Sequence, residues 1–178
     1  MNFKELNIGG VFEVDNFFVE DNRGFFVKTF HHEAFKKIGF EGLFEESYYS
    51  KSFKNVIRGM HFQLPPHEHE KLVYVTEGSI LDVILDLRKE SKTYGQFISI
   101  VLNENEKSVF IPKGCAHGFL TQSPSATVVY NVTTVYNKDS DAGILWNSFD
   151  FNWHLENPTL SSRDQSFTKF TDFKTPFI

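Results

Sequence analysis

The chain has 178 residues, and 23 Asp and Glu against 18 Lys and Arg give it a formal net charge of −5. This length fits one domain over residues 1–178 with a sizeable core, and the acidic balance offers no broad basic surface for nucleic acid. No apolar run reaches the roughly 18 residues of a membrane span, and the amino terminus lacks the apolar centre of a signal peptide. We therefore expect a cytoplasmic protein whose partners include neither nucleic acid nor a membrane.

Most of the chain is predicted to form short β-strands, because β-branched and aromatic residues recur between closely spaced turn signals. One short helix is expected over residues 31–39, where Gly39 ends it. The absence of alternating strands and helices argues against a parallel sheet and favours an all-β sandwich or barrel with short peripheral helices, of which the jelly roll is one form. In chain order, the predicted strands cover residues 11–21, 25–30, 56–63, 71–78, 80–88, 96–103, 108–114 and 126–136.

Four phenylalanines near the carboxyl end are spaced three or four residues apart: Phe167, Phe170, Phe173 and Phe177. This spacing indicates an apolar stripe. We expect the stripe to pack on the rest of the chain or on a second subunit.

Three of the seven histidines, His61, His67 and His69, lie within nine residues. Together with residues 111–119, this cluster resembles the motif by which cupin barrels hold a metal with three histidines and a glutamate. The position of that glutamate is Tyr74 here, and residues 63–71 carry two prolines and three charged residues, as an exposed loop does. We therefore expect no metal, with His67 and His69 exposed in the loop, and the only cysteine, Cys115, excludes a Cys-rich zinc site.

His61 lies in a segment whose alternation predicts a strand. The alternation places His61 and Gln63 on one face, with no bulky neighbour at Gly59, and Arg58 on the opposite face. From this segment alone, His61 is either a hydrogen-bonded core residue or the floor of a pocket.

Eight segments, taken in order, resemble the dTDP-4-dehydrorhamnose 3,5-epimerase family. They cover nearly the whole chain, and no single one of them is specific alone. The segments are DNRGFF at 21–26, NVIRGMHFQ at 55–63, KLVYVTEG at 71–78, DVILDLRKESKTYGQ at 82–96, IPKGCAHGF at 111–119, VYNVTTVY at 129–136, ILWN at 144–147 and LSSRD at 160–164. The resemblance implies a cupin jelly-roll barrel, a homodimer that shares strands, no cofactor, and a nucleotide-linked 4-keto-6-deoxy sugar as substrate.

The implied reaction inverts carbons next to a ketone, at C3, C5 or both. It requires a base that removes a proton, a group that holds the charge of the enolate, and an acid that returns a proton to the opposite face. By resemblance, His61 is the base and Asp164 orients it. Lys71 provides positive charge beside the enolate, and Tyr130, which stays protonated at neutral pH, is the acid.

Further residues are expected at the substrate by the same resemblance. His117 and Asp82 line the pocket, where Gln63 is also expected. Arg58 and Arg23 supply the cations for the diphosphate, which a guanidinium group binds in bidentate fashion.

Four positions depart from the family pattern around the nucleotide. Glu46 and Tyr48 stand where the family usually has a glutamine and an asparagine that help hold the substrate, and we keep both as candidate contacts. Lys28 replaces a glutamate, and Val135 stands where a tyrosine is expected to stack on thymine. Stacking of a base on an aromatic ring is worth roughly 1–3 kcal/mol, so another ring or another base is expected to compensate.

The sequence is also compatible with four other functions. The same chemistry on a GDP- or CDP-linked 4-keto hexose or heptose fits the departures, because a glutamate can accept from the amino group of guanine or cytosine. A sugar-nucleotide 3,4-ketoisomerase would use the same barrel and ligand. A non-catalytic sugar-nucleotide binding cupin would keep Arg23 and Arg58 but would not need the His61 and Asp164 pair, and a metal-dependent cupin enzyme would need His67 or His69 as ligands.

Overall fold

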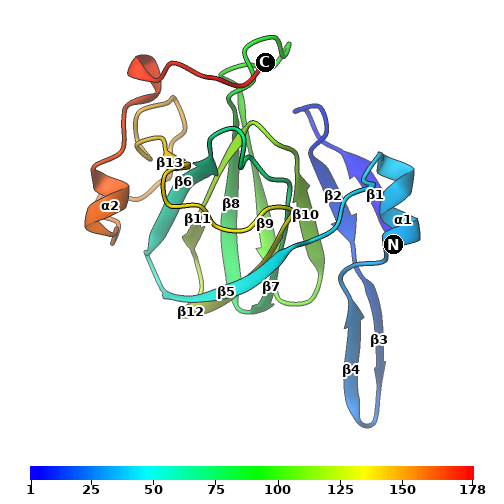
Figure 1. Ribbon diagram of the computed structural model, residues 1–178. Coiled ribbons are helices and arrows are strands. Elements are labelled where there is room, and N and C mark those ends of the chain that lie inside the picture. Colours follow the sequence, from blue (N-terminus) through cyan, green and yellow to red (C-terminus); the bar gives the residue numbers. More distant parts are fainter.

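The computed structural model describes residues 1–178, and its main body consists of two antiparallel β-sheets that face each other (Figure 1). The six-stranded sheet has the order β1-β2-β10-β7-β12-β5, and the five-stranded sheet has the order β13-β6-β11-β8-β9. This architecture confirms the predicted all-β cupin jelly roll with short peripheral helices. The strands are β1 Asn2–Glu5, β2 Phe12–Asp15, β3 Phe17–Asp21, β4 Gly24–Lys28, β5 Glu46–Phe53, β6 Ile57–Gln63, β7 Lys71–Glu77, β8 Ser79–Asp86, β9 Phe97–Asn103, β10 Lys107–Ile111, β11 Cys115–Thr121, β12 Ser125–Val132 and β13 Asp141–Gly143.

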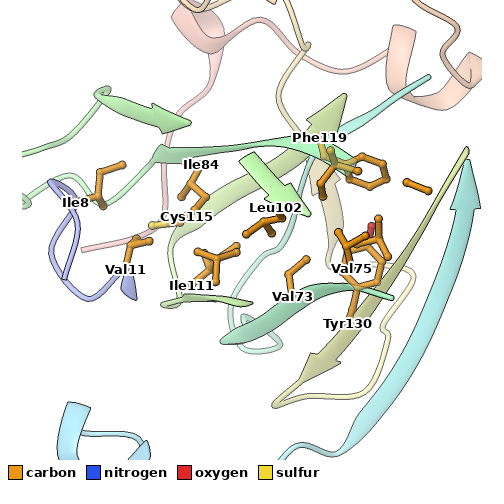
Figure 2. Close-up of a cluster of buried hydrophobic side chains, with 14 residues drawn as sticks. Ile8, Val11, Val73, Val75, Ile84, Leu102, Ile111, Cys115, Phe119 and Tyr130 are labelled. Carbon is orange, nitrogen blue, oxygen red and sulfur yellow. The ribbon is translucent and has the colours of Figure 1, made fainter. Parts of the chain in front are cut away.

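Alternation along the strands places apolar side chains between the two sheets. Strand β12 shows it most clearly, since every second residue from Ala126 through Val128 and Tyr130 to Val132 is buried. Figure 2 shows the resulting core, in which side chains from both sheets meet and Tyr130 is one of the members. Cys115 is also buried there as a free thiol, and burial raises its pKa to about 12, which keeps it protonated and unreactive.

The helices are short, as predicted. Residues 31–39 form α1 His32–Phe35 and a 3₁₀ turn, Lys36–Ile38, which ends at Gly39 with a φ of +84°. The other helices are α2 Ser162–Gln165 and a second 3₁₀ turn, Phe170–Asp172. None of these helices has the length and apolar character needed to cross a bilayer.

The carboxyl-terminal phenylalanines pack on the chain itself. The rings of Phe173 and Phe177 meet that of Phe62 edge to face, with centroids 5.3 and 5.7 Å away, and Phe170 joins the same apolar cluster. Phe167 instead contacts His61, with the two ring centroids 5.6 Å apart. The predicted stripe is therefore confirmed as an intramolecular contact, although the segment is mostly extended.

Strands β3 and β4 form a separate two-stranded hairpin that projects from the body, and we call it the arm (Figure 1). The arm buries almost none of its apolar side chains. Five of them are between 46% and 57% exposed: Phe17, Phe18, Val19, Phe25 and Phe26. A hairpin of this kind is marginal in water without a covering surface.

Strands β6 and β11 approach unusually closely at two glycines. A Cβ atom on Gly118 would lie 2.7 Å from Met60 Sδ, 2.8 Å from the Arg58 carbonyl oxygen and 3.0 Å from Gly59 Cα. Gly59 has a φ of +138°, and a Cβ there would lie 2.5 Å from Gly118 Cα. Larger residues at either position would push the two strands apart.

Gly118→Ala should therefore lower the free energy of unfolding by about 1–3 kcal/mol, because backbone atoms of β6 cannot yield without displacing the strand. Urea denaturation monitored by tryptophan fluorescence measures this loss. Gly9→Ala is the matched control, since a Cβ on Gly9 would meet nothing within 4 Å. Equal stability of the two variants would contradict the close approach.

Candidate active site

A cavity of about 510 Å³ opens between the two sheets, and both sheets supply its walls. Strands β6, β11 and β13 contribute from the five-stranded sheet, whereas β5, β7 and β12 contribute from the six-stranded sheet. The lining comprises Glu46, Tyr48, Ser50, Arg58, His61, Phe62, Gln63, His69, Lys71, His117, Phe119, Tyr130, Val132, Thr134, Tyr136, Asp141 and Arg163.

His61 forms a hydrogen bond with Asp164, and 2.9 Å separates His61 Nε2 from Asp164 Oδ1. Burial works to raise the pKa of Asp164, but the hydrogen bonds from His61 and from the Gly59 amide hold it below its ordinary value, so this carboxyl is ionised. A carboxylate can only accept, so Nε2 of His61 carries the proton and Nδ1 keeps a free lone pair. Burial lowers the pKa of His61, and the charge of Asp164 opposes that shift.

Local structure holds Asp164 in place. Ser161 caps α2, because its Oγ accepts a hydrogen bond of 3.0 Å from the Asp164 amide. The Gly59 amide donates to Asp164 Oδ2 at 3.1 Å, which ties the helix to strand β6. Phe167 lies against both His61 and Gly143, where a Cβ atom would come within 2.4 Å of the Phe167 ring.

Lys71 is buried in the wall formed by the six-stranded sheet and bridges to the other sheet. Its Nζ donates a hydrogen bond of 3.1 Å to the carbonyl oxygen of His61. Burial lowers the pKa of Lys71 to about 8, and the nearby carboxylates of Asp82 and Asp141 oppose that shift. The amine is therefore mostly cationic at neutral pH and loses its charge in mildly alkaline solution.

Tyr130 lies on β12, in the sheet that faces His61. It is only 8% exposed, and burial raises its pKa well above the ordinary value, so the phenol stays protonated. Its hydroxyl is 3.5 Å from Ser50 Oγ, and the centroid of its ring is 6.1 Å from that of His117. A proton donor and the free nitrogen of His61 thus lie on opposite walls of one cavity.

The predicted pair of His117 and Asp82 is formed, but only one member reaches the cavity. Asp82 Oδ2 lies 2.7 Å from His117 Nε2, and both side chains are buried. Asp82 is completely buried and does not line the cavity, so the prediction that it borders the pocket was wrong. It lies behind His117 because β8 and β11 are neighbouring strands.

Arg58 lines the cavity together with His61, which contradicts the alternation expected for this strand. Arg58 pairs with Phe119 and His61 pairs with His117, so three steps on β6 match two on β11. This extra residue is a bulge, and a bulge turns the following side chains to the other face. Arg58 Nε donates to Ser52 Oγ at 2.8 Å and its Nη2 donates to the Lys51 carbonyl oxygen at 3.4 Å, so the guanidinium group is held against strand β5.

Arg23 does not reach the cavity of its own chain. It lies at the turn of the arm, its side chain is 85% exposed, and its guanidinium binds Asp21 at 2.6 Å. The turn is far from the two sheets in Figure 1. The prediction that Arg23 and Arg58 act together is therefore not met within one subunit.

Glu46 and Tyr48 both line the cavity, as expected for substrate contacts. Glu46 Oε2 accepts a hydrogen bond of 2.6 Å from the Tyr136 amide, which fixes the loop after β12. Tyr136 lines the cavity and Val135 does not. Both residues lie in the loop after β12, which ends at Val132, so the predicted strand over 126–136 was too long. The absence of a tyrosine at position 135 therefore removes no ring from the cavity wall.

The two loop histidines are half-buried, so the prediction that both are exposed was wrong. His67 Nδ1 lies 2.9 Å from Ser140 Oγ, away from the cavity. His69 lines the cavity beside Gln63, and burial lowers its pKa to about 3, which keeps it neutral. The side-chain amide of Gln63 binds this loop, since its Nε2 donates to the His67 carbonyl oxygen at 2.8 Å.

No three His, Cys, Asp or Glu side chains are arranged to hold a metal ion. The expectation that no metal takes part stays a prediction. Five polar cavity residues were not predicted, because they come from loops, polar strands and the carboxyl-terminal segment without a local motif: Ser50, His69, Thr134, Asp141 and Arg163. Among them, Arg163 and Asp141 form an ion pair of 2.6 Å.

These features define a cupin-type sandwich whose cavity has a histidine on one sheet, held by an aspartate of helix α2, and a lysine and a buried tyrosine on the other sheet. The chain belongs to the dTDP-4-dehydrorhamnose 3,5-epimerase family, whose model matches residues 5–172. It is 40% identical to the Shigella flexneri dTDP-4-dehydrorhamnose 3,5-epimerase over 156 residues, which cover 85% of this chain and 86% of that protein.

Solved structures of the same family agree. The Bacillus anthracis enzyme with TDP and pyrophosphate bound has a TM-score of 0.89 and 35% identity, over 93% of this chain and 97% of that one. The Legionella pneumophila enzyme in complex with dTDP-4-keto-L-rhamnose has a TM-score of 0.89 and 29% identity, over 97% and 94% of the two chains.

The pKa shifts predict the pH dependence of kcat/KM. Activity should fall at low pH as His61 becomes protonated, with a midpoint below its ordinary value of 6.5, and should fall again as pH rises through about 8, where Lys71 loses its charge. Lys71→Arg should move the alkaline limb upward, because arginine stays charged. An alkaline limb that is unchanged in this variant would contradict the assignment to Lys71.

Proposed function

We propose that this chain inverts C3, C5 or both carbons of dTDP-4-dehydro-6-deoxyglucose through an enolate. The observation that carries the proposal is the placement of His61 and Tyr130 on facing sheets of one cavity. An inversion next to a ketone removes a proton from one face of the sugar and returns one to the other. A base and an acid on opposite walls match that requirement.

In the first step, Nδ1 of His61 takes the proton from the carbon next to the ketone. The electron pair of the C–H bond moves into the new C=C bond, and the C=O electron pair moves onto the oxygen. Asp164 stabilises the imidazolium that forms, through the hydrogen bond to Nε2. Lys71 places a buried positive charge near the enolate oxygen, where low polarity strengthens its effect.

In the second step, the enolate collapses to the ketone and its carbon takes the proton of the Tyr130 hydroxyl from the opposite face. This leaves a tyrosinate and an imidazolium, which return to their starting states by proton exchange with solvent. The elevated pKa of Tyr130 means that the phenol does not lose its proton before the enolate forms. Two rounds at C3 and C5 would give the double epimerisation named in the relatives.

A binding protein would not need this arrangement. A buried lysine and a histidine held by a buried carboxylate both cost stability, and such perturbed groups are typical of catalytic sites. A 3,4-ketoisomerase would also begin by removing the C3 proton, but it would then return a proton to C4 instead of C3. Its product would carry the ketone at C3, which NMR distinguishes from an epimer.

His61→Ala should abolish both exchange and inversion, with kcat falling about 100-fold or more and substrate affinity largely kept, because a general base acts in the transition state. His67→Ala is the control, since this histidine lies outside the cavity. Turnover by coupled assay and substrate titration by calorimetry separate the two effects. Equal damage in both variants would contradict the division of the histidine cluster into a catalytic His61 and a loop histidine without a catalytic role.

The dTDP nucleotide is favoured by the ligands of the Bacillus and Legionella relatives. Tyr136 lines the cavity and offers a ring on which a base can stack. The GDP or CDP alternative, with a hexose or heptose, rests on Glu46, whose carboxylate can accept from a base amino group. One carboxylate oxygen of Glu46 already accepts from the Tyr136 amide. That oxygen is engaged and less able to accept from a base amino group, which favours dTDP.

We expect kcat/KM for the dTDP sugar to exceed that for the GDP and CDP sugars by at least about tenfold, or about 1.4 kcal/mol, in line with the ligands of the Bacillus and Legionella relatives. Assays on the three nucleotide forms of the same 4-keto sugar measure this ratio. Tyr136→Ala should raise KM for the dTDP sugar, because the stacking ring is lost, and Val135→Ala is its matched control because Val135 lies outside the cavity. A GDP or CDP sugar that is turned over faster would assign the chain to the alternative substrate.

We also propose a homodimer in which the arm of one subunit covers its partner. The exposed phenylalanines of the arm need an apolar surface, and Arg23 at the arm's turn has no role in its own cavity. Arg23 would then meet the diphosphate in the partner's cavity beside Arg58.

A complementation assay tests this arrangement. Arg23→Ala and His61→Ala, each nearly inactive alone, should recover about a quarter of wild-type activity when refolded together, because half of the dimers then contain one complete site. Mixing Lys37→Ala with His61→Ala is the control for dilution, since Lys37 is an exposed residue outside the arm. If the mixture recovers no activity and the protein sediments as a monomer, the shared site is contradicted.

A further inference from the structure

Tyr48 lies directly opposite Tyr130 in the pairing of β5 with β12. The two rings are stacked, with centroids 4.8 Å apart and planes inclined by 19°. Both side chains line the cavity. The role of Tyr48 is therefore linked by direct contact to the residue that we assign as the acid.

The hydroxyl of Tyr130 has only a weak anchor. Its one hydrogen-bond partner in the chain is Ser50 Oγ, at 3.5 Å, the outer limit for such a contact. Tyr130 belongs to the buried core cluster, so the orientation of its phenol depends on packing, and the aromatic rings that face it there are Tyr48 and His117. His117 is itself fixed by Asp82, whereas Tyr48 is held on β5, at the edge of its sheet.

Alternation along β5 separates two neighbouring tyrosines. Tyr48 faces the cavity together with Glu46 and Ser50, whereas Tyr49 faces outward and is 74% exposed. The hydroxyl of Tyr48 has no hydrogen-bond partner in the chain, so the contact that Tyr48 makes with Tyr130 is made by its ring. Tyr49 provides a control on the same strand.

We propose that Tyr48 is a positioning residue: its ring holds the phenol of Tyr130 in line with the carbon that must be protonated. This inference rests on the role of Tyr130 given under Proposed function. When the ring of Tyr48 is removed, Tyr130 can tilt, and a displacement of about 1 Å is enough to slow a proton transfer severely. The enolate then survives longer and His61 returns a proton to the original face.

The experiment follows dTDP-4-keto-6-deoxyglucose in deuterated water, in which His61 picks up solvent deuterium. Deuterium in recovered substrate reports return to the original face, and inverted product reports transfer from Tyr130. The ratio of the two is measured by NMR and mass spectrometry for wild type, Tyr48→Phe, Tyr48→Ala and Tyr49→Ala. Tyr48→Leu is included to remove the ring while keeping an apolar side chain, in case the alanine variant does not fold.

Tyr48→Ala and Tyr48→Leu should raise the ratio of exchange to inversion at least about tenfold, whereas Tyr48→Phe and Tyr49→Ala stay within about twofold of wild type. An unchanged ratio in the first two, with only KM raised, would overturn the proposal and make Tyr48 a substrate contact. A ratio raised as much in Tyr48→Phe would also overturn it, because the hydroxyl and not the ring would then be responsible. Wild-type protein that neither exchanges nor inverts would instead refute the proposed function.

Discussion

The hydrogen bond between His61 and Asp164 joins residues 103 positions apart in the sequence, and the rest of the site depends on it. Asp164 can reach His61 only because the carboxyl-terminal segment returns across the five-stranded sheet. Ser161 caps the short helix that carries Asp164, Gly59 donates a second hydrogen bond to the carboxylate, and Phe167 packs against the imidazole. The carboxyl-terminal segment that closes the fold thus also completes the histidine–aspartate pair that we propose as the base.

The close approach of β6 and β11 has a second consequence for the site. The bulge beside Gly59 brings Arg58 and His61 to the same wall, although simple alternation would separate them. The facing sheet then supplies Lys71 and Tyr130. In the proposed reaction, two sheets packed face to face therefore present different chemistry to the two faces of a flat sugar enolate.

Local patterns in the sequence were sufficient for most of the fold. The strands around residues 71–78 and 126–132 carry alternating β-branched residues, which is a local signal. Strand β5 was missed because Glu46–Phe53 is rich in polar residues and is a strand only through its pairing with β12. The bulge at Gly59, the partial burial of His69 and the distance of Arg23 from the cavity likewise depend on contacts between distant segments. The candidate residues came from a resemblance to a family, and their spatial arrangement came from the structure.

In the proposed mechanism His61 and Tyr130 act on opposite faces of one enolate, and a position-resolved deuterium measurement on Tyr130→Phe distinguishes the two roles. We predict that substrate recovered from this variant in deuterated water carries deuterium next to the ketone, while inversion is reduced about 100-fold or more. The base still forms the enolate, but no acid remains on the far wall. Loss of exchange and inversion to the same extent would contradict the two-sided mechanism and leave Tyr130 with a structural role.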